Sequence, residues 1–191
     1  APREYIRLHR RTRAEIMAGA EKAMERGKAL SKGLTQKEQQ VLGKIFRKEA
    51  LTNEDVLSLR RNERMIDAIE AAKAARAELD SLGGEAAMKG LLSEEAFVRN
   101  YGRYMPRMYR RYNLNWEQIL DQYRLSKPSK LDLDRFMKRT DIPEEVRVLM
   151  GEIKEPAFPV AKGIYQLTKT LAQRDLFDRI AANPQWSVPA E

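Results

Sequence analysis

Residues 65–82 read MIDAIEAAKAARAELDSL, a stretch dominated by alanine and by charged residues with long unbranched side chains. These residue types have high helix propensity, and the stretch contains neither glycine nor proline. Its apolar residues recur mostly at spacings of three and four, which is typical of an amphipathic helix. The alanine-rich turns favour close packing against another helix. The stripe expected to be buried consists of Met65, Ile66, Ile69, Ala72, Ala75, Leu79 and Leu82.

We expect the helix that contains this stretch to begin near residue 53 and to end near residue 82. Thr52 or Asn53 can cap its N-terminus, because their short side chains accept hydrogen bonds from first-turn amides. The glycine pair at 83–84 is expected to end or kink the helix, since glycine has low helix propensity. Ser93, followed by two glutamates, then begins another short helix.

Toward the N-terminus, residues 3–31 have few helix breakers and carry a thin apolar stripe between many charges. This pattern predicts a long, mostly exposed helix that Gly33 ends. A helix with so few apolar positions gains little from packing alone, so we expect it to need a partner. Residues 35–38, Thr-Gln-Lys-Glu, have the spacing of a capping box and predict a second helix over about 36–48.

Toward the C-terminus, short helices are expected between residues 113 and 151, and a final helix from near Pro156 or Pro159 to Asn183. Its apolar stripe comprises Val160, Ile164, Leu167, Leu171, Phe177 and Ile180. Strand-like alternation is nearly absent from the sequence, so the predicted class is all-α, an elongated multi-helix unit with an extended Tyr/Arg-rich connector. The predicted divisions are residues 1–33, 34–112 and 113–183, with 184–191 as an exit linker or tail.

The connector, residues 99–112, breaks the helical pattern because Gly102 and Pro106 disfavour a continuous helix. Arginine pairs with phosphate and tyrosine stacks on bases, so its composition suits a single-stranded nucleic-acid platform. The same side chains can instead pack an irregular connector against helices and neutralise carboxylates. Both interpretations stay open for Arg99, Tyr101, Arg103, Tyr104, Arg107, Tyr109, Arg110, Arg111 and Tyr112.

A second basic cluster lies in the first thirteen residues, where five arginines face a single acid, Glu4. On a helix, several of these arginines share one face, and their field would attract phosphates or an acidic partner surface. We take this cluster as a second candidate nucleic-acid-binding site. Its candidate residues are Arg3, Arg7, Arg10 and Arg11.

Composition excludes several kinds of chemistry. The chain has 36 Lys and Arg against 28 Asp and Glu, no Cys and one His, which excludes disulfides and thiolate or multi-histidine zinc sites. His9 lies among the arginines of the N-terminal cluster, so we interpret it as a solvated helix residue. Asp132 and Asp134 could meet a magnesium ion, but no phosphate cradle or acidic calcium loop accompanies them. We therefore expect no metal, no cofactor and no catalytic residues, and no uncharged run is long enough to span a membrane.

One part of the sequence resembles a known family. Residues 90–97 read GLLSEEAF and residues 100–109 read NYGRYMPRMY, followed later by IPEE at 142–145. These motifs resemble a stretch of the large polyvalent proteins of tailed bacteriophages and related mobile elements, over roughly residues 55–186. Met105 stands where that family carries leucine.

The resemblance implies a helical segment of a very long phage-encoded chain, carried in the virion and delivered with DNA into the host. It implies no catalytic residues in this segment. The expected function is therefore non-enzymatic and structural, with other virion proteins or copies of the chain as partners. The expected location is the virion, or the host cytoplasm after delivery. The alternative is a nucleic-acid-binding module that uses the two arginine clusters, with DNA as the partner.

Overall fold

The computed structural model describes residues 3–102, 108 and 151–186 of the chain. Six α-helices contain 78% of those residues, and no β-strand occurs among them. The predicted all-α class is therefore confirmed for the part of the chain that is described. Most of the predicted Tyr/Arg connector, the helices expected between residues 113 and 150, and residues 187–191 lie outside it.

By its backbone contacts the chain divides into two units, residues 1–106 with 154–191 and residues 107–153. All six helices belong to the first unit. In the second unit the described residues are few, and the Ile153 amide donates a hydrogen bond of 2.8 Å to the Met108 carbonyl oxygen.

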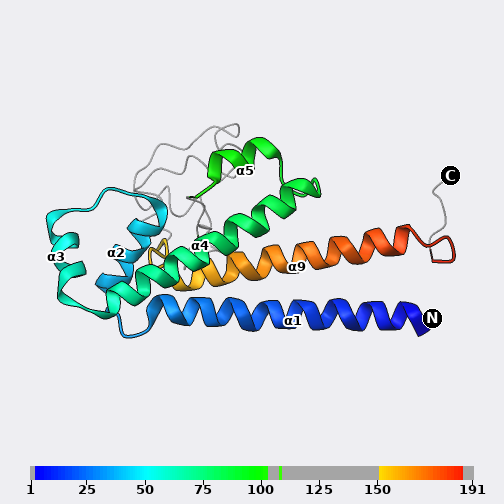
Figure 1. Ribbon diagram of the computed structural model, residues 1–191, viewed down its shortest axis with the longest axis horizontal. Helices are drawn as coiled ribbons and strands as arrows, with labels where there is room; N and C mark the ends of the chain where they lie inside the picture. The colour runs from blue at the N-terminus through cyan, green and yellow to red at the C-terminus, as the bar shows by residue number, and fades with distance from the viewer. Residues whose placement is uncertain (1–2, 103–107, 109–150, 187–191) are drawn as a thin grey trace, which may run out of the picture. The chain divides into compact units, whose positions relative to one another are not determined.

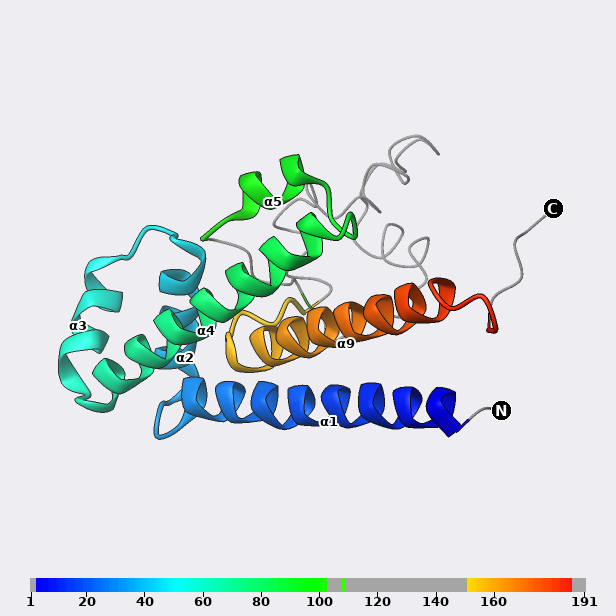
Figure 2. The ribbon, with the colours of Figure 1, turned by 45° about the vertical axis from the view of Figure 1, so that its right-hand side comes forward.

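Three long helices form the body of the first unit (Figure 1). They are α1 (Arg3–Ser31), α4 (Arg64–Met88) and α9 (Ala157–Ala181). In both views α1 and α9 lie side by side and antiparallel, so the N-terminus of α1 lies beside the C-terminus of α9 (Figures 1 and 2). Each helix carries apolar residues on the side that meets its neighbours. Burial of these residues stabilises the helices, which helix propensity alone would not keep folded.

Two short helices follow α1, and each begins with a capping box. At α2 (Gln36–Arg47) the Thr35 hydroxyl accepts from the Glu38 amide at 3.3 Å, and Glu38 accepts from the Thr35 amide at 2.7 Å. At α3 (Asn53–Arg61), Thr52 and Asp55 exchange the same two bonds at 3.2 and 2.8 Å. The box predicted at residues 35–38 is therefore confirmed, and Thr52 is the cap of α3.

The single helix predicted from about residue 53 to residue 82 is wrong, because Asn62 separates α3 from α4. Its backbone is extended, with φ −129° and ψ 110°. The Asn62 side chain accepts from the Arg64 amide at 3.0 Å and donates to Glu38 Oε1 at 3.0 Å. Asparagine competes for backbone groups in this way, which is why it favours helix ends.

The helix was expected to end or kink at Gly83 and Gly84. It does not end there, since α4 continues through both glycines to Met88. A Cβ atom on Gly83 would lie 3.3 Å from the ring carbons of Phe97 in α5 (Glu94–Asn100). The missing side chain thus lets α5 approach α4 closely. The chain turns instead at Gly90, whose φ of +67° suits glycine.

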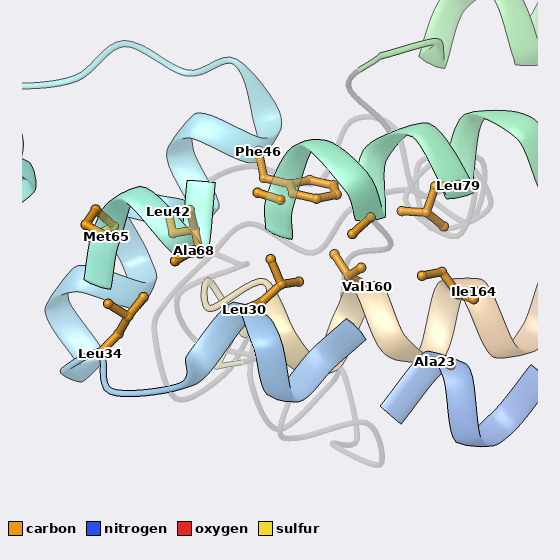
Figure 3. Close-up of a cluster of buried hydrophobic side chains, with 12 residues drawn as sticks. Ala23, Leu30, Leu34, Leu42, Phe46, Met65, Ala68, Leu79, Val160 and Ile164 are labelled. Atoms are coloured by element: carbon orange, nitrogen blue, oxygen red, sulfur yellow. The ribbon is translucent and has the colours of Figure 1, made fainter. Parts of the chain in front are cut away.

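The core lies where α1, α2, α4 and α9 meet (Figure 3). Its most buried large side chains include Leu30, Leu42, Met65, Val160 and Ile164, each at most 1% exposed. Burial of one such side chain contributes about 1.5–3 kcal/mol, so the four helices stabilise one another here. The core therefore joins segments that lie far apart in the sequence.

Two residues of the predicted stripes lie elsewhere. Ile66 is 67% exposed, and Ala68 is buried in the core instead. Phe177 of α9 is 62% exposed. The buried positions of α4 follow one another at spacings of three or four, and Ile66 falls outside this register because it directly follows the buried Met65.

Candidate interaction surface

The inner face of α1 carries small residues that lie against α9. Gly19, Ala23 and Gly27 follow one another at one-turn spacing. A Cβ atom on Gly27 would lie 3.0 Å from the Ala157 carbonyl oxygen and 3.1 Å from the Cβ atom of Ala161. The distance between two packed helices depends on the side chains at their contact, so glycine and alanine allow a close approach. The partner that the thin apolar stripe of α1 requires is thus α9 of the same chain.

Two cations of α1 are used inside the bundle. Lys22 and Arg26 both bind the carboxylate of Glu78 on α4, at 2.8 and 2.9 Å. Burial raises the pKa of Glu78, but the hydrogen bonds from these two cations outweigh it and lower the pKa overall. This carboxylate therefore fastens α1 to α4.

The arginines near the N-terminus of α1 are not used in this way. Arg3, Arg7, Arg10 and Arg13 are exposed and form no ion pair with any residue that the structure describes. The spacing of four and three places Arg3, Arg7 and Arg10 on one face of the continuous helix. Arg11 differs, because its Nε donates to Glu15 at 2.9 Å. Three of the four candidate residues of this cluster thus have no ion-pair partner among the described residues.

A hollow of about 260 Å³ lies between the N-terminal turns of α1 and the end of α9. Its lining includes Arg7, Arg11 and Arg179, together with Glu4 and Trp186. The Trp186 indole N–H is buried and has no hydrogen-bond partner among the described residues, and the ring meets Tyr5 edge-on at 5.6 Å. Sequence reasoning missed Arg179 and Trp186, because only the antiparallel pairing of α1 with α9 brings them to this end.

These side chains can recognise an anion. Guanidinium groups donate two parallel hydrogen bonds to a phosphate or carboxylate, and the indole N–H is a further donor. Glu4 on the rim opposes an anion and would limit the affinity of a single phosphate. The hollow therefore suits a polyanion that also contacts the neighbouring arginines of α1.

An apolar stripe also runs along the outer side of α1. Ile6, Met17 and Met24 are 41%, 57% and 58% exposed. Their spacings of eleven and seven residues bring them to nearly the same angle around the helix axis, at 100° per residue. They form a line that does not face α9, whose contacts lie along Gly19, Ala23 and Gly27. We call the line of these three residues, together with the charges beside it, the outer face of α1.

The charges of the outer face change sign along the helix. Its first half carries Arg3, Arg10 and Arg13, with Arg7 at the edge beside the hollow, whereas its second half carries Glu21 and Glu25, followed by the exposed Lys28 in the last turn. Both glutamates are exposed, and neither forms an ion pair within the described part of the chain. Positive and negative ends on one helix face give the surface a direction, which a partner with the opposite order would match.

Only two candidate residues of the connector can be placed. Arg99 lies in the last turn of α5 and is exposed. Tyr101 is 60% exposed, and its ring meets Phe97 edge-on at 5.6 Å. Arg103, Tyr104, Arg107, Tyr109, Arg110, Arg111 and Tyr112 lie outside the described residues.

A second hollow, of about 290 Å³, lies between α4, α5 and α9 and is mainly apolar. Leu79, Phe97 and Leu167 line it, and Asp80 at its edge accepts a hydrogen bond of 3.1 Å from the Gly102 amide. The Asp80 carboxylate thus holds the turn after α5 rather than pointing freely into the hollow.

The residues considered for catalysis are placed as follows. His9 is exposed, and its ring lies 4.4 Å from that of Tyr5. Asp132 and Asp134 lie outside the described residues. Among the residues that are described, no group of three His, Asp or Glu side chains could hold a metal ion.

Comparisons with protein-family models, with curated proteins and with solved structures gave no match. No helix in the described ranges is long and apolar enough to cross a membrane.

Proposed function

We propose that this chain is a non-enzymatic structural module that acts by packing helices with copies of itself or with partner chains. The observation that carries the proposal is the outer face of α1. It combines a line of exposed apolar side chains with charges that no described residue neutralises. Exposed apolar side chains that are rimmed by polar and charged groups are common on surfaces that bind another protein.

The proposed setting is the virion of a tailed bacteriophage, as part of a virion-associated or ejected protein during assembly or DNA delivery. The motifs at residues 90–97 and 100–109 support it by their resemblance to the large polyvalent proteins. In this setting the partners are other virion proteins or further copies of the chain, in the particle or in the host cytoplasm after delivery.

Mass spectrometry of purified phage particles from the source of the sequence tests this proposal. Peptides from both α1 and α9 are expected in the particles, on a polypeptide whose size an intact-mass measurement gives. Host lysate collected before particle assembly serves as the control for carry-over. Particles that lack these peptides, while the lysate contains them, would contradict the virion setting.

A second function, nucleic-acid binding, is favoured by the hollow that Arg7, Arg11 and Arg179 share. Binding through arginine to phosphate releases counterions, so the affinity for a single-stranded oligonucleotide should fall steeply as salt rises. Changing these three arginines to glutamine should weaken binding uniformly across sequences and reduce the salt slope. The matched control changes the same number of positive charges outside the hollow, with Arg13, Lys162 and Lys169, all exposed, altered to glutamine.

The connector offers a parallel test of the same function. Arg103, Arg107, Arg110 and Arg111 changed together to glutamine should weaken binding in the same sequence-independent way. Fluorescence anisotropy at several salt concentrations measures the oligonucleotide affinity of this variant and of the variant in the hollow. Absent or salt-insensitive binding by the unaltered chain would remove nucleic-acid binding as a function.

A further inference from the structure

We propose that the outer face of α1 pairs antiparallel with the same face of a second copy of this chain. The inference deepens the structural function proposed above, because it names the surface and the partner. It depends on the spacing of the exposed apolar residues and on the order of the charges beside them.

The spacing on the outer face is that of a two-stranded coiled coil. Starting at Ile6, successive steps of four and three residues reach Met17 and then Met24, and this alternation is the heptad pattern. The intervening positions are Arg10, Arg13 and Ala20. Arginine stems can cover apolar surface while their charged ends reach water, so these positions continue the stripe.

The charges of α1 select the orientation of the two helices. In a parallel pair, the arginines of one copy would lie beside those of the other, and the glutamates beside the glutamates. In an antiparallel pair, Arg7 lies opposite the partner's Glu21, and the reciprocal contact forms by symmetry. Arg3 lies in the same way opposite the partner's Glu25. Opposite charges therefore meet at Arg7 and Arg3 only in the antiparallel orientation, in which Lys28 is the one like charge near the partner's Arg3.

The apolar residues match in a register that differs from that of the charge pairs by only two residues, about 3 Å at 1.5 Å per residue. Ile6 lies opposite the partner's Met24, and the stem of Arg13 packs on the partner's Met17. The exposed Ala14 lies near the centre of symmetry, where a small side chain lets the two helices approach. Lys22 and Arg26 are the neighbouring cations on α1, and they bind Glu78 on α4 instead of Glu21 and Glu25. The two glutamates thus stay available for the second copy.

Two charge-reversed variants test this pairing by sedimentation velocity and light scattering, on protein treated with nuclease. The first is Arg7→Glu with Arg10→Glu, and the second is Glu21→Arg with Glu25→Arg. The unaltered chain should form a species of about twice its 22.1 kDa mass as concentration rises. Each variant alone should dimerise at least roughly tenfold more weakly, because like charges then face each other. An equimolar mixture of the two variants should recover the dimer, since opposite charges face each other again.

The matched control carries Lys162→Glu and Lys169→Glu on the exposed side of α9, with the same change of net charge as the first variant. It should dimerise like the unaltered chain, and circular dichroism should find all variants equally folded. A monomer at every concentration would overturn the self-pairing, as would variants that dimerise normally or a mixture that stays monomeric. The particle measurement tests the structural function by itself, so a monomeric chain found in virions would reject only the self-pairing.

Discussion

Gly27 of α1 faces the Ala157 carbonyl oxygen of α9 so closely that even a methyl side chain would be crowded between them. A Cβ atom at residue 27 would lie 3.0 Å from that oxygen. This relationship explains how a helix with few large apolar residues is held along its length. Small residues let the two backbones approach closely. The many close contacts between the helices then stabilise their packing without large apolar side chains.

A bulky side chain at this contact should destabilise the bundle. We expect Gly27→Leu to lower the free energy of unfolding by about 1–3 kcal/mol, because overpacking forces the helices apart. Urea denaturation followed by circular dichroism measures the change. Ala18→Leu, at an exposed position of the same helix, is the control and should change stability little. Equal stability of both variants would show that α1 does not pack on α9 as described.

Leu30 couples α1 to the core and has no exposed surface. We expect Leu30→Ala to lower the free energy of unfolding by about 2–5 kcal/mol, through lost burial and the cavity left behind. Leu57→Ala removes the same atoms from a residue that is 50% exposed and should cost far less. If chemical denaturation gives the two variants the same midpoint, the core does not lie where α1, α2, α4 and α9 meet.

The capping box of α2 should contribute measurably to stability. Thr35→Ala removes the hydroxyl that accepts from the Glu38 amide, and we expect a loss of about 1 kcal/mol. Thr35→Ser keeps the hydroxyl and should retain most of the stability. Because Glu38 also accepts from Asn62, a double-mutant cycle of Thr35→Ala with Asn62→Ala should be non-additive. Strict additivity would indicate that the two contacts act independently.

The stability of the bundle should fall in acid partly through Asp55. Hydrogen bonds from the Lys44 ammonium, at 2.7 Å, and from the Thr52 amide lower the pKa of Asp55 from its ordinary 3.8 to about 2. Because the folded pKa is the lower one, the stabilising contribution is present above the unfolded pKa and is lost as pH falls toward 2. Asp55→Asn should therefore have a flatter stability profile between about pH 4 and pH 2. Parallel profiles for the two proteins, measured by urea unfolding, would contradict the assignment.

Local signals in the sequence predicted local structure well. The capping box at Thr35 and the cap at Thr52 each depend on residues within a few positions of one another. The chemistry that fixes them is complete within one turn of the chain, so no knowledge of the fold is needed.

Contacts between helices explain the helix ends and the hollow that were not predicted correctly from the sequence. Asn62 breaks the predicted helix partly because its side chain reaches Glu38, which belongs to another helix. Gly83 is tolerated inside α4 because Phe97 packs over it. Arg7 and Arg179 line the same hollow only because α1 and α9 pair antiparallel. The spacing of residues in the sequence could not predict this hollow.

The self-pairing of α1 is tested most directly by cysteine cross-linking, because the chain has no cysteine of its own. Ile6→Cys and Met24→Cys each introduce a single thiol on the outer face. In the antiparallel register, identical thiols of two copies lie about 27 Å apart, at 1.5 Å per residue, whereas residue 6 meets the partner's Met24. The account therefore predicts no cross-linked dimer from either variant alone and a cross-linked dimer from their mixture under oxidising conditions. Cross-linking of each variant with itself would contradict the antiparallel order, and no cross-linking in the mixture would contradict the pairing.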